Sequence, residues 1–244
     1  MLKKFTYSLL GLLLLPSLPA LGLSLYQLLV DLQIEDTERA LLSRFAMGAF
    51  CWLVIFLVIT RPVKSYILAH ELTHLMAAWV TGVPAGHLVF HRGGGSVEVA
   101  QTTLWISLAP YFVPFYGLLV LLAHWVAQLW WDPSRWSAGL PFLLGFTWSY
   151  HLCFTLFSLS RAQSDIRPYG LLGAYPLIAA VNLLMLCLMI SAVNAHPLSA
   201  DLRLCWDHQQ HTYAAIYRNF LEFYHMTRKS VGISCIFPFG TQVQ

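Results

Sequence analysis

The sequence has few charged residues, and this scarcity excludes most soluble proteins of its length. Only 10% of its 244 residues are Asp, Glu, Lys or Arg, whereas 58% are hydrophobic, and the mean hydropathy is +0.63. A soluble domain usually carries about 25% charged residues, because its surface must face water. The composition therefore predicts an integral, multi-pass membrane protein, and we expect it to lie in the cell membrane.

Basic clusters and closely spaced cysteines are also missing. The net charge is +3, and its lysines and arginines are spread along the chain, so no patch of the kind that binds nucleic acid is present. The five cysteines are too few and too scattered for a disulfide scaffold, and no CxxC or CxxH spacing offers a metal site built on cysteine. The partners that remain are the lipid bilayer and other membrane proteins. The sequence predicts no oligomeric state.

Long runs without charge divide the chain into candidate membrane spans. They cover residues 5–30, 45–60, 99–131, 136–160 and 168–200. With the segment 65–82 they predict about six transmembrane helices in an all-α fold. We expect two N-terminal spans in residues 1–64, a catalytic membrane core in 65–194 and a polar tail in 195–244. The first run follows Lys3 and Lys4, as in a secretory signal peptide, but its length favours a retained span.

The segment SYILAHELTHLMAAWVTG, residues 65–82, contains His70, Glu71 and His74 within an apolar stretch. Two histidines four residues apart lie on one face of a helix, one turn from each other, and can bind one zinc ion. Glu71 is then placed as the general base for a water molecule that zinc activates. Ionisable residues in a membrane helix cost roughly 2.5–3.5 kcal/mol each on insertion scales and are functional candidates for that reason.

A catalytic zinc usually takes three protein ligands, so His70 and His74 need a third. Thr147, His151, Thr155 and Ser158 form one polar face of the fifth span, and a helix that continues to the residue before Pro168 brings Asp165 onto that face. Asp165 is the best anionic candidate, although it could instead pair with Arg161 or Arg167. His151, deeper on the same face, is the competing ligand.

The stretch AGHLVFHRGGGSVEVAQTT, residues 85–103, is the least helical part of the sequence. Two short β-prone runs, 89–91 and 96–99, flank Gly93, Gly94 and Gly95, which is a hairpin-like pattern. One interpretation is a plain loop in solvent. The other is a hairpin beside the metal, whose free edge binds an extended substrate segment by strand addition, with the three glycines in contact with substrate.

Asn182 is the buried polar residue of the last span, residues 170–193. It could contact the substrate or form hydrogen bonds inside the helix bundle. From His196 onward the chain is polar and aromatic, and it contains a plausible helix at 212–225.

With these residues in view, the chain resembles the site-2 protease family of intramembrane zinc metallopeptidases. The matching segments are HELTH at 70–74, GGGSVEV at 93–99, SLAPYF at 107–112 and QSDI at 163–166. The resemblance implies a three-helix catalytic core, zinc ligands His70, His74 and Asp165, and Glu71 as the base. It also implies an active site toward the cytosol, whereas the lysines and arginines divide almost evenly between the two sides of six full spans and predict no orientation.

The expected activity is hydrolysis of a peptide bond in or beside a transmembrane segment of another membrane protein. Two alternatives remain on the sequence alone. One is a membrane zinc protease that trims exposed peptides, for which Glu98 and Glu222 are the glutamates that could supply a third ligand after the motif. The other is a non-catalytic membrane binding protein on the same scaffold, against which the intact Glu71 argues.

Overall fold

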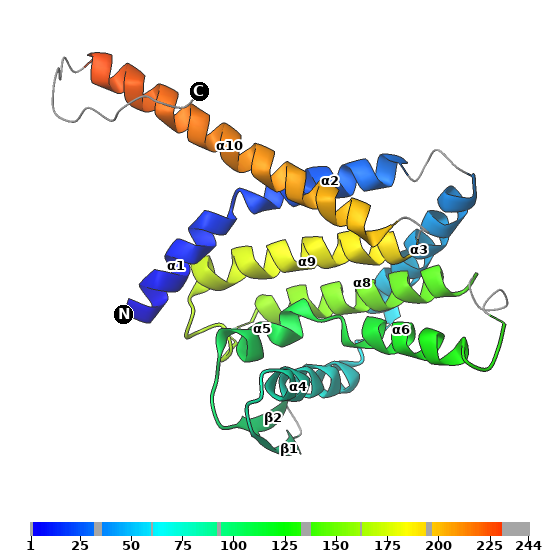
Figure 1. The fold of residues 1–244 in the computed structure, drawn as a ribbon. Coiled ribbons are helices and arrows are strands. Elements are labelled where there is room, and N and C mark those ends of the chain that lie inside the picture. The colour runs from blue at the N-terminus through cyan, green and yellow to red at the C-terminus, as the bar shows by residue number, and fades with distance from the viewer. Residues whose placement is uncertain are drawn as a thin grey trace.

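The computed structural model describes residues 2–31, 36–59, 61–91, 94–132, 138–161, 163–193 and 197–230, and it is mostly helical (Figure 1). The helices are α1 (Leu2–Leu14), α2 (Ser17–Asp31), α3 (Asp36–Val54), a π-helical turn η1 (Ile55–Ile59), α4 (Val63–Val80), α5 (Leu104–Phe112), α6 (Phe115–Ala127), α8 (Leu140–Leu159), α9 (Leu171–Val193) and α10 (Leu198–Ser230). The strands are β1 (Ala85–His91) and β2 (Gly94–Val99).

The helices form layers. In Figure 1, α9 lies between the α1 and α2 pair on one side and α8 on the other, while α4 and the hairpin lie below α5 and α6. Tyr7, Leu159, Ile166 and Tyr169 belong to one apolar cluster, so the start of α1, the end of α8 and the turn that follows α8 lie at the same end of the bundle. This end also holds the candidate metal centre.

Helices α3 and α8 pack very closely, because each helix has a glycine that lies against the backbone of the other helix. A Cβ on Gly145 would lie 1.9 Å from the Phe45 carbonyl oxygen, and one on Gly48 would lie 2.0 Å from the Phe142 carbonyl oxygen. Helix association in a membrane depends on such small residues, since apolar side chains gain little by leaving lipid. The pair α3 and α8 is therefore a fixed support for the residues at the end of α8.

Four helical segments are long and apolar enough to cross a membrane: Lys3–Asp31, Asp36–Ile59, Leu140–Leu159 and Leu171–Ala192. The pair α5 and α6 counts as a fifth if its two halves are one span, but they are bent by 73°. The bend falls at Pro114, which has no N–H to continue the hydrogen bonding of α5. The described residues thus support a multi-pass membrane protein with four or five spans. The expectation of six spans included α4, which is not among the helices long and apolar enough to cross a membrane.

Three local expectations differ from the structure. The short polar segment 31–44, between the first two uncharged runs, predicts a loop, but the chain is helical from Asp36, and Asp36 and Glu38 in the first turn interact favourably with the helix dipole. Helix α8 ends at Leu159 and does not continue to Pro168; residues 164–169 form turns. The helix expected at 212–225 in the polar tail is longer: α10 runs from Leu198 to Ser230, over 33 residues.

The predicted hairpin is present. Strands β1 and β2 pair antiparallel, from Ala85 opposite Val99 to His91 opposite Gly94. Gly82, with φ 69°, reverses the chain after α4, a backbone conformation that glycine adopts without steric cost. The hairpin therefore folds back beside α4, with β2 as the strand that packs mainly against that helix.

Candidate metal centre

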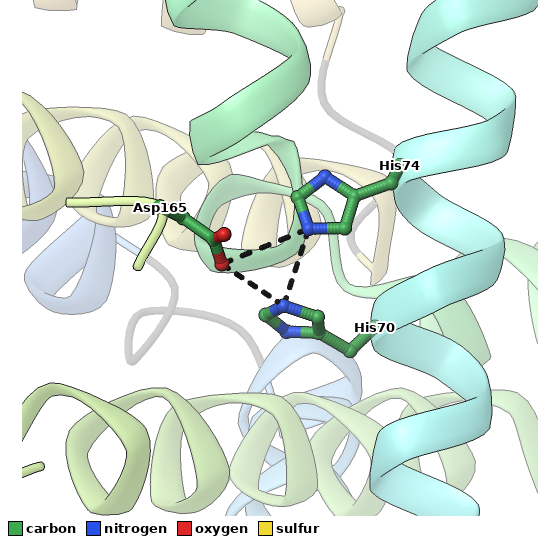
Figure 2. Close-up of side chains that lie close together, drawn as sticks. All are labelled: His70, His74 and Asp165. Atoms are coloured by element: carbon green, nitrogen blue, oxygen red, sulfur yellow. Dashed lines mark hydrogen bonds and ion pairs between the residues drawn. The ribbon is translucent and has the colours of Figure 1, made fainter. Parts of the chain in front are cut away.

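His70, His74 and Asp165 converge on one point (Figure 2). The two histidines project from successive turns of α4, and Asp165 reaches them from the turns after α8. His70 Nε2 lies 3.3 Å and His74 Nε2 lies 3.7 Å from Asp165 Oδ2, and the two Nε2 atoms are 3.2 Å apart. Their side chains are 11–21% exposed. The group could hold a metal ion.

The donor set fits zinc. Ligand atoms that bind zinc tetrahedrally at about 2.0–2.2 Å lie about 3.3–3.6 Å from one another. The three separations in the structure are 3.2, 3.3 and 3.7 Å. Two imidazoles and one carboxylate would leave a fourth position open, as in catalytic zinc sites. Within the described ranges, this is the one group of three or more His, Cys, Asp or Glu side chains close enough together to share a metal ion.

The histidines are already oriented for a metal. His74 Nδ1 lies 2.7 Å from the Ile106 carbonyl oxygen. A carbonyl can only accept, so Nδ1 donates the proton and the neutral ring presents the lone pair of Nε2 to the centre. His70 Nδ1 is 3.2 Å from the Tyr66 hydroxyl, one helical turn earlier. These contacts fix both rings from behind.

Asp165 is held as an anion. Its Oδ1 accepts a hydrogen bond of 3.2 Å from Ser164, and its Oδ2 accepts one of 3.3 Å from the buried Tyr111 hydroxyl. Burial by itself raises the pKa of Asp165. With no metal bound, the hydrogen bonds and positive charges that His70 and His74 contribute when protonated outweigh burial and hold this pKa well below its usual range. A permanent negative charge compensates part of the charge of a divalent ion.

Tyr111→Phe should weaken zinc binding without unfolding the protein. Tyr111 is fully buried, and its hydroxyl is the donor that orients Asp165 Oδ2. Loss of such an outer contact typically costs about 10–100-fold in metal affinity. The measurement is the zinc dissociation constant in detergent, by competition with a chromophoric chelator. Tyr150→Phe is the matched control, because the Tyr150 hydroxyl bonds to Ser65; equal affinities for both variants would exclude the positioning role.

Glu71 lies on the wall of the same cavity. This cavity has a volume of about 420 Å³, and the side chains of His70, His74 and Asp165 line it with Glu71. Glu71 is 7% exposed, and a Cβ placed on Gly95 would lie 2.6 Å from its Cγ and 3.1 Å from its Oε1. The backbone of β2 therefore passes directly over the Glu71 side chain, and only glycine fits there without displacing it.

The other residues singled out in the sequence lie in different places. Gly94 and Gly95 line the cavity, and Gly93 lies outside the described residues. His151 is buried and is not one of the converging ligands; its Nε2 lies 3.2 Å from Asn182 Oδ1. Asn182 donates to the Tyr111 and Ile178 carbonyl oxygens at 2.7 and 2.8 Å, so its amide supports the bundle and does not line the metal cavity.

Two supporting tyrosines were not found from the sequence. Tyr66 precedes His70 by four residues, and this helical spacing could have identified it as a partner of the ring. Nothing local in the sequence indicates Tyr111, because its contact with Asp165 joins residues 54 positions apart.

Comparison of the chain with protein-family models, curated proteins and solved structures found no match. The fold and the site describe a multi-pass helical membrane protein with a His, His and Asp group that could bind a metal ion.

Proposed function

We propose that the protein is an intramembrane zinc metalloprotease that cleaves transmembrane or juxtamembrane segments of other membrane proteins. The observation that carries the proposal is the convergence of His70, His74 and Asp165 on one wall of a cavity that Glu71 also lines. A cluster of this composition costs free energy in an apolar bundle, and residues with such a cost are by default functional candidates.

Zinc, when bound, lowers the pKa of water and polarises the substrate carbonyl. The protein's own residues would transfer the proton and hold the metal ligands in place. Glu71 takes a proton from the attacking water and passes it to the leaving amine. The Ile106 carbonyl and the Tyr66 hydroxyl keep the histidine rings in place, and Tyr111 keeps the carboxylate of Asp165 in place. Burial of Glu71 under β2 keeps bulk water from competing for its carboxylate.

The position of the hairpin favours a peptide as the substrate of the proposed enzyme. Residues 94–97 and Val99 of β2 line the cavity, and β1 occupies the other edge of the strand. A peptide bond within a helix has its carbonyl and amide groups engaged, so hydrolysis requires a locally extended segment. A strand edge next to Glu71 can hold such a segment by backbone hydrogen bonds.

The basic residues support a cytosolic active site. Lys3 lies over the Tyr169 ring, and Arg61 and Arg161 lie over the Phe157 ring, so all three are at the end of the bundle that holds Asp165. Arg44 lies at the other end, where it donates to the Ala138 carbonyl. Lysine and arginine accumulate on the cytosolic side of membrane proteins. With α4 no longer counted as a full crossing, the charges favour one side.

The test is whether purified protein in lipid vesicles cleaves a single-span membrane protein, and whether cleavage requires both zinc and the Glu71 carboxylate. Cleavage that survives the loss of either would contradict the proposal.

A matched pair of glycine variants tests the contact between β2 and Glu71. Gly95→Ala should reduce kcat by roughly 10–100-fold, because the new methyl group displaces the general base, and displacements of about 1 Å have such effects. Gly94→Ala should remain near the parent activity, since a Cβ there meets nothing within 4 Å. Both variants should keep full zinc content. Equal loss of activity in the two would indicate that the backbone contacts substrate and does not position Glu71.

A further inference from the structure

Two arginines lie over one aromatic ring, Phe157, that lines the metal cavity. The guanidinium carbon of Arg161 lies 4.3 Å and that of Arg61 lies 5.3 Å from the centre of the Phe157 ring. Arg161 and Phe157 both line the cavity with the metal group. Because both guanidinium groups contact the same ring, the distance between them cannot exceed the sum of their distances to its centre.

Neither guanidinium has an acidic partner in the described part of the chain. The ion pairs found there are Asp36 with Arg39 and the contacts of Asp165 with the two histidines. Asp165 is therefore committed to the histidines, and the contacts of Arg61 and Arg161 with Phe157 hold them without neutralising them. Both arginines are exposed, so an incoming ligand can reach them.

We infer that Arg161, together with Arg61, selects substrates that carry an acidic side chain beside the segment to be cleaved. A guanidinium matches a carboxylate with two parallel hydrogen bonds. The same cations repel lysine and arginine, which are the usual flanking residues of membrane spans on the cytosolic side. This specificity rests on the proposed protease function and narrows it to a class of substrate.

The experiment uses the full-length protein in phosphatidylcholine vesicles with three single-span substrates. The substrates differ only in two juxtamembrane residues, which are Glu, Gln or Lys. The parent protein should cleave them with kcat/KM in the order Glu, Gln, Lys, with about tenfold between the extremes. Arg161→Glu should abolish this preference, because the new carboxylate lies near Arg61 and the two charges offset each other. Lys4→Glu, the same change of charge at an exposed residue of α1 at the same end of the bundle, should keep it.

The outcomes separate the possible explanations. Equal cleavage of the three substrates by the parent, or an unchanged order in Arg161→Glu, overturns the assignment and leaves the protease function intact. No cleavage of any substrate by the zinc-loaded parent overturns both. Addition of phosphatidylserine to the vesicles should not alter the order of kcat/KM. If this lipid removes the preference of the parent protein but has no effect on kcat/KM of Arg161→Gln, the arginines bind lipid headgroups and not substrate, and the assignment is overturned.

Discussion

Glu71→Gln should abolish cleavage while leaving zinc and fold in place. Glutamine has nearly the shape of glutamate, so it fits beneath Gly95 as the native side chain does. Its amide cannot take a proton from water, and loss of a general base commonly costs about 10²–10⁴-fold in rate. Because Glu71 is not one of the three converging ligands, the metal group is unchanged.

The measurement compares kcat on a single-span substrate with the zinc content and the thermal unfolding of the same preparation. Chelator-treated parent protein is the control for zinc-independent cleavage by contaminants. Turnover by Glu71→Gln within tenfold of the parent would exclude Glu71 as the base, whatever the zinc content.

Asp165→Ala should remove both zinc and activity. Without the carboxylate, His70 and His74 offer two neutral ligands, and a divalent ion bound by these alone in an apolar bundle is poorly compensated. Asp165 Oδ2 lies within 3.7 Å of both Nε2 atoms, so no other ligand of the described chain can substitute for it without rearrangement. We expect zinc content below a tenth of the parent value after dialysis.

His151→Ala is the control for this experiment. His151 is buried and bonds to Asn182, so its loss tests whether the removal of another buried histidine of the bundle also affects zinc. It should leave most of the zinc bound, even if the protein becomes less stable, because a missing hydrogen bond to Asn182 disturbs α8 and α9 and not the ligands. Zinc lost with His151 and retained without Asp165 would establish a three-histidine site instead.

The sequence analysis predicted Asp165 as the third ligand on the basis of a helix that the structure does not contain. The prediction continued α8 to Pro168 and placed Asp165 on its polar face, whereas α8 ends at Leu159 and Asp165 lies in turns. The turns bring the carboxylate back over α4, which a straight helix need not do. The competitor His151 does lie on the polar face, but that face meets Asn182 of α9. Helical periodicity identifies a face and does not say which neighbour it contacts.

The sequence by itself determined the membrane class and the pairing of His70 with His74, and it offered the hairpin as one of two interpretations, since each depends on composition or on residues close in the chain. Local geometry fixes such features: residues four apart on a helix always share a face. Tertiary structure decided the rest. Whether Asp165 or His151 meets the histidines, that Tyr111 supports Asp165, and that Gly95 covers Glu71 all depend on how distant segments pack. The bend between α5 and α6, the close approach of α3 and α8 and the turns after α8 are likewise features of the tertiary structure, which helical or strand spacing along the chain does not reveal.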